Sequence, residues 1–162
     1  MGRLSGKTAF VSGGAKGLGA EMARAMHEEG ANVMVTDVLE DEGIKLADAH
    51  ENMQFLRHDV TDEAQWQAAI DATQEAFGGL DVLVNNAGIV HDATPLEETS
   101  LAQWRHVMAV DLDGVFLGAK YAVRAMKDKG GSIINVSSIY GIVGSAAQAP
   151  YHAAKGGVRL LT

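Results

Sequence analysis

A tyrosine and a lysine in the last part of the sequence have the side chains and the spacing of an acid/base pair. Tyr151 and Lys155 are four residues apart in a stretch with a helical pattern, so they lie only about 40° apart around the helix axis and can meet one ligand. A fixed ammonium favours the ionised form of a nearby phenol. Such a phenol can pass a proton to or from an alcohol near neutral pH. Ser138, just after an apolar strand at 132–137, can donate a hydrogen bond to the same substrate oxygen.

The tyrosine and lysine alone are weak evidence for an active site. On many helices a tyrosine four residues before a lysine is only a solvated pair. The chain has three tyrosines, and Tyr121 and Tyr140 have no lysine at that distance. The signal is strengthened by Ser138, thirteen residues before Tyr151, and by a glycine-rich turn near the N-terminus.

The glycine-rich turn at 12–19 joins the first apolar strand, at 8–12, to a helix at 18–29. Glycines let the backbone turn tightly and approach a pyrophosphate at the helix N-terminus. The spacing here is G-x-x-x-G-x-G, which differs from the general dinucleotide fingerprint G-x-G-x-x-G. A glycine turn without a ligand is the alternative. Asp37 ends the second strand, where a carboxylate would reach the adenosine ribose hydroxyls, and the alternative there is a solvated loop residue.

Strand and helix patterns alternate along the chain and would position these groups. Strands are expected at 8–12, 32–37, 53–57, 82–85 and 132–137, and helices at 18–29, 40–51 and 62–77. A long helix runs from Ser100 to the residues before Gly130, and a further helix holds Tyr151. The alternation predicts an α/β fold, a Rossmann-like doubly wound parallel sheet with helices on both faces, and ligands beyond the carboxyl ends of the strands. The long helix carries apolar residues at spacings of three and four, which predicts one wide buried stripe made of Trp104, Val107, Met108, Leu112, Val115, Phe116, Ala119, Val123 and Met126.

The serine, tyrosine and lysine, taken with the glycine turn, resemble the short-chain dehydrogenase/reductase family of the classical type. The resemblance covers residues 7–162 and leans toward hydroxysteroid dehydrogenase-like members, with 3-oxoacyl-carrier-protein reductase-like members as the alternative. Two further stretches share it: Asp59-Val60 at the end of the third strand, and Asn85-Asn86-Ala87-Gly88 at the end of the fourth.

The resemblance implies a role for each matching residue. Tyr151 would be the acid/base, Lys155 would bind the nicotinamide ribose and lower the pKa of the tyrosine, and Ser138 would orient the substrate oxygen. The cofactor would also be held by the glycine turn, Asp37 and the ends of the third and fourth strands. Those cofactor-binding positions are Gly13, Lys16, Gly17, Leu18, Gly19, Asp37, Asp59, Val60, Asn86, Ala87 and Gly88.

The sequence departs from the family pattern in two places. The family's fourth catalytic position is an Asn in a pattern like Asn-x-x-Gly-x-Phe, in a helix that is locally distorted there, and this chain has Asp111 in that position. The resemblance implies that the Asp111 charge lies near Lys155, where it would stabilise the ammonium and weaken its effect on Tyr151. Family members also continue into two more strands and a loop over the substrate, whereas this sequence stops at Thr162. We therefore expect one dinucleotide-binding domain over 1–162, cut short after the fifth strand and the start of the following helix. The chain is then either part of a longer enzyme or a short product with an open sheet edge.

Composition limits the other possibilities. A net charge of -8 without clustered Lys and Arg argues against a nucleic-acid partner, and the absence of Cys removes disulfides and thiolate chemistry. The six histidines show no metal-ligand spacing, so no metal site is expected. No apolar run is long enough for a membrane span, which favours a cytoplasmic protein. A homo-oligomer, a dimer or a tetramer, is expected of the full-length protein.

The sequence thus predicts an NAD-dependent oxidoreductase that acts on a secondary alcohol or ketone, and a hydroxysteroid is one candidate substrate. NAD is preferred to NADP because Asp37 would face the 2'-phosphate of NADP, although Lys16 is a basic residue that NADP-using relatives often place near that phosphate. A dinucleotide-binding module without turnover is the alternative from another class. Asp111 and the missing C-terminal part favour that alternative.

Overall fold

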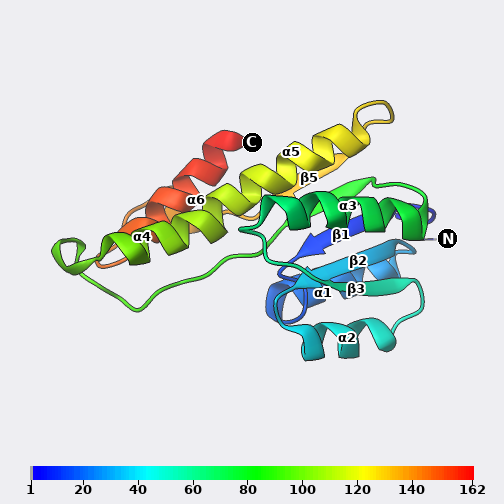
Figure 1. The fold of residues 1–162 in the computed structure, drawn as a ribbon, viewed down its shortest axis with the longest axis horizontal. Coiled ribbons are helices and arrows are strands. Elements are labelled where there is room, and N and C mark those ends of the chain that lie inside the picture. Colours follow the sequence, from blue (N-terminus) through cyan, green and yellow to red (C-terminus); the bar gives the residue numbers. More distant parts are fainter. Residues whose placement is uncertain (1) are drawn as a thin grey trace.

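The computed structural model describes residues 2–162 and has a five-stranded parallel sheet at its centre (Figure 1). The sheet order is β3-β2-β1-β4-β5, and all four neighbouring pairs are parallel. The strands are β1 (Thr8–Ser12), β2 (Asn32–Asp37), β3 (Met53–Arg57), β4 (Val82–Asn85) and β5 (Ser132–Asn135). This order reverses direction at β1, as a doubly wound sheet does, so the predicted fold class is confirmed.

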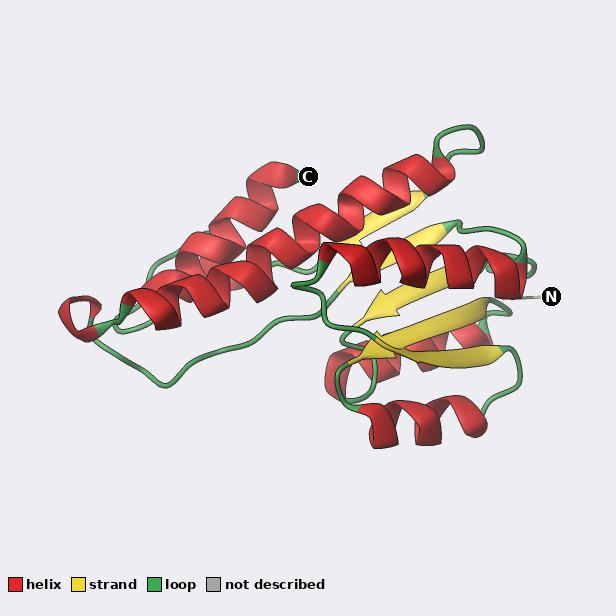
Figure 2. Cartoon of the chain, in the orientation of Figure 1, coloured by secondary structure: helices red, strands yellow, loops and turns green. Residues whose placement is uncertain are grey.

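Helices cover both faces of the sheet (Figure 2). They are α1 (Gly17–Glu28), α2 (Glu40–Asp48), α3 (Glu63–Phe77), α4 (Leu101–Met108), α5 (Gly114–Met126) and α6 (Ala149–Leu161). A π-helical turn, Ala109–Asp113, joins α4 to α5, and short 3₁₀ turns lie at Leu96–Glu98 and Ile139–Gly141. No helix within residues 2–162 is long and apolar enough to cross a membrane.

Local signals in the sequence set the ends of the best-defined helices. The Asp62 side chain accepts hydrogen bonds from the N–H groups of Ala64 and Gln65 and so caps α3, which ends at Gly78 in the left-handed conformation. Ser100 caps α4 by accepting from the N–H of Gln103.

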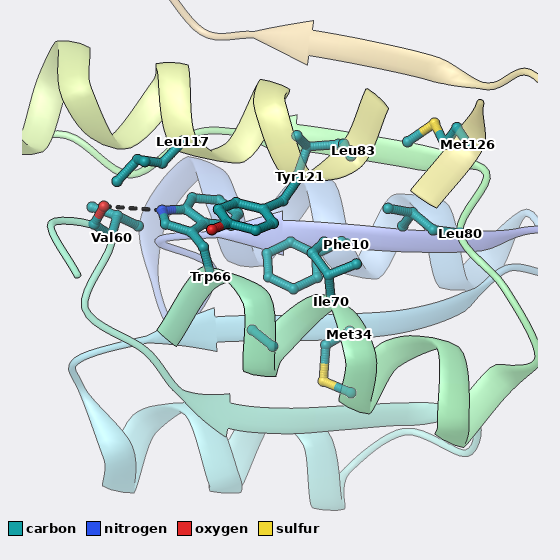
Figure 3. Packing of buried hydrophobic residues seen from close by; sticks show 12 residues of the cluster. Phe10, Met34, Val60, Trp66, Ile70, Leu80, Leu83, Leu117, Tyr121 and Met126 are labelled. Atoms are coloured by element: carbon teal, nitrogen blue, oxygen red, sulfur yellow. Dashed lines mark hydrogen bonds between the residues drawn. The ribbon is translucent and has the colours of Figure 1, made fainter. Parts of the chain in front are cut away.

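The core consists of two apolar layers, one on each face of the sheet. On one face α3 and α5 pack against the strands, with Phe10 stacked on Trp66 at a ring separation of 5.6 Å (Figure 3). The Trp66 indole N–H donates to the carbonyl of Val60, which satisfies the one polar atom of that ring. On the other face α1 and α2 pack through small and aliphatic residues, including Ala20, Ala23, Leu46 and Ala47.

Four sequence-based expectations need correction. The strand expected at 132–137 ends at Asn135, and the Ser137 hydroxyl beyond it donates to the carbonyl of Lys155 on α6. The helix expected at 40–51 ends at Asp48, and the one expected at 18–29 ends at Glu28. The long helix does not bury all of its predicted stripe, because Phe116 and Val123 are 49% and 56% exposed.

The π-helical turn explains the last correction. A π turn adds a residue to the helical repeat, so the face that meets the core is shifted beyond it. Val115 and Met126 of the predicted stripe stay buried in α5, and they are joined there by Gly114, Leu117, Gly118, Tyr121 and Ala122. The same turn is the local distortion that the family resemblance implied.

The site elements lie at one end of the sheet. The arrowheads of the parallel strands point toward the end of the molecule at which α4 and α6 lie (Figure 2). The glycine turn, Asp37 and the β4 end all follow carboxyl ends of strands, the edge at which a doubly wound sheet binds its ligands.

Candidate active site

Helix α6 positions the tyrosine and the lysine. The helix begins at Ala149, with Pro150 in its first turn, where a missing N–H costs nothing. Tyr151 is half-buried and its ring meets the edge of Tyr140, with 6.3 Å between ring centroids. The Lys155 ammonium lies 5.6 Å from the centroid of the Tyr151 ring. The structure therefore brings the predicted phenol and ammonium together on one face of α6.

The Lys155 side chain is almost completely buried, with 3% of the residue exposed. Its Nζ donates to the carbonyl of Val136 at 3.2 Å, just beyond β5. The same Nζ lies 3.5 Å from Oδ2 of Asp111. The ammonium is thus held between the end of a strand and the π-helical turn.

Asp111 is completely buried in the π-helical turn. Its Oδ1 accepts a hydrogen bond from the N–H of Ile89 at 2.8 Å, and burial raises the pKa of its carboxyl against the opposing effects of that N–H and of Lys155. Gly88 leaves room for the pair, because a Cβ there would lie 3.2 Å from the Lys155 Nζ and 3.3 Å from Asp111 Oδ2. The charge expected near Lys155 is thus in direct contact with its ammonium.

Ser138 begins the 3₁₀ turn Ile139–Gly141. Its Oγ accepts from the N–H of Tyr140 at 3.2 Å, which leaves the hydroxyl hydrogen free to be donated elsewhere. The turn lies directly against α6, since a Cβ on Gly141 would come within 2.6 Å of the Lys155 carbonyl oxygen. Ser137 fixes the same contact by donating to that oxygen at 2.8 Å. Sequence reasoning missed Ser137, whose residue type alone carries no signal.

The glycine turn has the shape that a phosphate cradle needs. Gly13 and Gly17 have φ values of +62° and +58°, which favour glycine. A Cβ on Gly13 would lie 2.7 Å from Ala87 Cα, and one on Gly19 would lie 2.2 Å from the Gly13 oxygen. No side chain caps the N-terminus of α1, so its N–H groups are available to an anion. These features fit the pyrophosphate of a dinucleotide.

The end of β4 holds the glycine turn in place. The Asn86 side-chain amide donates to the carbonyls of Ser12 and Gly13, at 3.0 and 2.9 Å. The Ser12 hydroxyl in turn accepts from the N–H groups of Asn86 and Ala87, at 3.1 and 3.2 Å. Asn86 and Ala87 therefore act here on the loop, and Ser12 is a second contributor that sequence reasoning did not single out.

Asp37 connects the end of β2 to the glycine turn. Its Oδ2 accepts from the N–H of Ala15 and its Oδ1 from that of Leu39, both at 3.1 Å. A carboxylate has about four acceptor positions, so it can still accept from ribose hydroxyls. The fit to an adenosine ribose is retained.

The remaining predicted cofactor positions, Asp59, Val60, Lys16 and Leu18, differ in their burial and in their contacts. Asp59 Oδ1 accepts from the N–H and the hydroxyl of Thr61, which fixes the loop after β3. Val60 is 8% exposed and lies in the core, where its carbonyl accepts from the Trp66 indole. Lys16 and Leu18 are exposed at the start of α1. Among residues 2–162 no three His, Cys, Asp or Glu side chains are grouped closely enough to hold a metal ion.

Comparison with known proteins gives consistent relatives. A family model described as short chain dehydrogenase matches residues 7–162. The chain is 51% identical to a 3-alpha-(or 20-beta)-hydroxysteroid dehydrogenase of Mycobacterium tuberculosis (strain ATCC 25618 / H37Rv), over 99% of this chain and 62% of that protein. It is 47% identical to a trans-4-hydroxycyclohexanecarboxylate dehydrogenase of Sinomonas cyclohexanicum, over 99% of this chain and 65% of that protein. An NADP-dependent (R)-specific alcohol dehydrogenase of Lentilactobacillus kefiri is 43% identical, with 99% of this chain and 65% of that protein covered. The chain thus spans less than two thirds of the length of these relatives.

Proposed function

The chain belongs to the short-chain dehydrogenase family, and we propose that the protein carrying it is an oxidoreductase that transfers a hydride between NAD and a secondary alcohol or ketone. The observation that carries this proposal is the convergence on α6 of the Tyr151 ring and the buried Lys155 ammonium, 5.6 Å from ring centroid to Nζ. A chain that only bound a nucleotide could use Lys155 for the ribose, but it would have no use for the Tyr151 phenol beside that ammonium.

The cofactor would lie along the carboxyl ends of the strands. Gly13, Gly17 and Gly19 would admit the pyrophosphate, and the Asp37 carboxylate would accept from the adenosine ribose. When bound, the nicotinamide supplies or accepts the hydride. The protein's part is to fix the substrate and to move the proton.

Three side chains would handle that proton. Tyr151 would donate its phenolic proton to the ketone oxygen during reduction, or take the alcohol proton during oxidation. Lys155 would stabilise the phenolate and donate to the ribose hydroxyls. The free hydroxyl hydrogen of Ser138 would donate to the substrate oxygen, which fixes its position relative to Tyr151.

NAD is the proposed cofactor in preference to NADP. The Asp37 carboxylate would stand close to the 2'-phosphate of NADP, and two like charges at that distance repel. Two observations favour NADP instead. One relative is named as NADP-dependent, and Lys16 is an exposed basic residue near the turn that could bind the 2'-phosphate. Fluorescence titration with NADH and NADPH tests the choice, and tighter binding of NADPH would contradict it.

The proposed substrate class is a ring-bearing secondary alcohol or its ketone, such as a hydroxysteroid. Two relatives are named for hydroxyl groups on steroid or cyclohexane rings. An acetoacetyl thioester, the substrate type of a 3-oxoacyl-carrier-protein reductase, is the second candidate. An NADH-oxidation screen over steroid ketones, 4-oxocyclohexanecarboxylate, acetoacetyl thioesters and simple ketones separates them. The Tyr151→Phe protein serves as the control in each assay.

A dinucleotide-binding module without turnover is the remaining alternative. The observation that favours it is the charged Asp111 in direct contact with Lys155. Tight NADH binding with no turnover on any substrate of the screen, at any pH, would support this alternative over the enzyme. The cytoplasmic location and the homo-oligomer stay predictions.

A further inference from the structure

The most unusual electrostatic feature of the chain is an ion pair that water does not reach. Asp111 and Lys155 are 0% and 3% exposed, whereas the other ion pairs of residues 2–162 lie at the surface. Removing two charges from water costs several kcal/mol for each ion. The attraction between the two charges must offset this cost, so removal of either partner would leave the other as an uncompensated buried charge.

The two charges are fixed in different ways. Asp111 Oδ1 is bound by the N–H of Ile89, while Oδ2 is buried without a hydrogen bond, 3.5 Å from the ammonium. Lys155 Nζ donates to the Val136 carbonyl. The contact between the two side chains is therefore mainly electrostatic, and each is oriented by the backbone of a different segment.

The ammonium of this pair is the same one that lies beside the Tyr151 ring. An isolated ammonium would favour phenolate, but the opposite charge of a carboxylate 3.5 Å from it opposes that effect. The other titratable group near Asp111 is His106 on α4, whose charge when protonated favours the carboxylate. Asp113, in the same turn, is exposed.

We propose that Asp111 is a positioning residue that acts through Lys155: it holds the ammonium and weakens its effect on the phenol, so that Tyr151 works as acid/base at a higher pH than beside an unpaired lysine. This rests on the proposed function for its catalytic consequence, but the effect on the phenol itself does not require turnover.

The test is an ultraviolet difference titration of tyrosinate in the cofactor-free protein that carries this chain. Subtracting the titration of the matching Tyr151→Phe protein isolates Tyr151 from the other tyrosines. Asp111→Asn should lower the pH at which Tyr151 ionises. Asp113→Asn, which removes the same charge from an exposed position two residues away, should leave it unchanged.

A pH profile of kcat/KM with the best substrate of the screen adds the catalytic reading. In Asp111→Asn the limb that reports Tyr151 should move to lower pH by the same amount, and Asp113→Asn should not move it. A shift in the tyrosinate titration with no turnover in any protein would sustain the inference and contradict the proposed function. Turnover with an unshifted Tyr151 titration would overturn the inference and leave the function standing.

A measurement on the unmodified sequence covers the case in which Asp111→Asn does not fold. In protein labelled with carbon-13 aspartate, the Asp111 carboxyl resonance should respond to the ionisation of Tyr151. Tyr151→Phe should remove that response. A resonance that is indifferent to Tyr151 would overturn the inference.

Discussion

Tyr151 is expected to carry the proton transfer and not the binding of the cofactor. A phenol that acts only on the proton in flight stabilises the transition state, so its loss should lower turnover and spare affinity. Tyr151→Phe should reduce kcat by about 10²- to 10⁴-fold with the Kd for NADH nearly unchanged. Stopped-flow turnover and fluorescence titration measure the two quantities.

Tyr121→Phe is the matched control for this exchange, because its hydroxyl bonds to Glu63 on the α3–α5 side of the sheet. It should leave turnover near that of the unchanged protein. Lys155→Ala should harm both turnover and NADH affinity, since it also removes a donor to the ribose. A Tyr151→Phe protein with near-normal turnover, or one that simply fails to bind NADH, would contradict the assignment.

His58 should make the stability of the protein depend on pH. The ring is 1% exposed and lies at right angles to Trp66, with one nitrogen beside the Thr36 hydroxyl and the other without a partner. Burial lowers the pKa of His58 to about 4, against the opposing charges of Asp59 and Asp62. The unfolded chain therefore binds the proton more readily than the native protein does.

The stability that the neutral, buried His58 contributes is fully present above pH 6.5. It is lost as the pH falls from 6.5 toward about 4. Its limit is about 3 kcal/mol of unfolding free energy. Urea unfolding at a series of pH values should show this slope, and His58→Phe should flatten it even if the variant is less stable at pH 7. His50→Asn, at a half-buried surface position, should keep the slope. An unchanged slope in His58→Phe would assign the acid sensitivity to other groups.

For individual residues, the sequence predicts which side chains could be functional better than it predicts which groups they contact. Tyr151 and Lys155 are found from their spacing, because one helix turn dictates that they share a face. The Asp111 contact with Lys155 joins two helices, and the Asn86 bonds to the glycine turn join two strands, so both depend on the folded sheet. Ser12 and Ser137 carry no pattern at all and become visible only through their bonds.

At the scale of elements, the glycine turn is closely packed against the start of α1 and the end of β4. Gly19 lies inside α1, where alanine would ordinarily favour the helix by about 1 kcal/mol. Here a Cβ would lie 2.2 Å from the Gly13 oxygen and 2.6 Å from the Asn86 side chain. Gly19→Ala should therefore lower both stability and NADH affinity, opposite in sign to the helix propensity.

Gly79→Ala is the matched control, since a Cβ at that position meets nothing within 4 Å. It should leave the urea midpoint and the Kd for NADH unchanged. If Gly19→Ala proved more stable than the original protein and bound NADH equally well, the turn would have to be far looser than the close approach to Asn86 implies.

The elements themselves follow from the sequence wherever periodicity is local. Short apolar runs predict the strands of four to six residues and their alternation with helices. That alternation in turn predicts that neighbouring strands are parallel. The outward face of α5 is the exception. A three-and-four spacing is read on a regular helix, and the π turn at Ala109–Asp113 breaks the regularity on which Phe116 and Val123 were assigned to the core.

At the scale of the whole molecule, the comparison with relatives shows how much of their length this chain covers. The chain spans about 62% of the length of its hydroxysteroid dehydrogenase relative. In residues 2–162 the strand β5 pairs only with β4, and Ile134 on it is 43% exposed. We therefore expect these residues to specify the substrate pocket least, whereas the proposed cofactor positions follow the ends of four strands that all lie within them.

The exposed apolar face of α5 supports the predicted homo-oligomer. Phe116 and Val123 are seven residues apart, on one side of the helix, and are 49% and 56% exposed. Large apolar side chains grouped on one face are typical of an association surface.

Phe116→Asp should shift the protein to a smaller species in size-exclusion chromatography with light scattering, because a buried unpaired charge opposes association. Ile44→Asp, at a comparably exposed position on α2, should keep the original assembly, and NADH binding should survive in both. A protein that is monomeric at all concentrations before any substitution would contradict the prediction, and the exposed residues of α5 would then need another explanation.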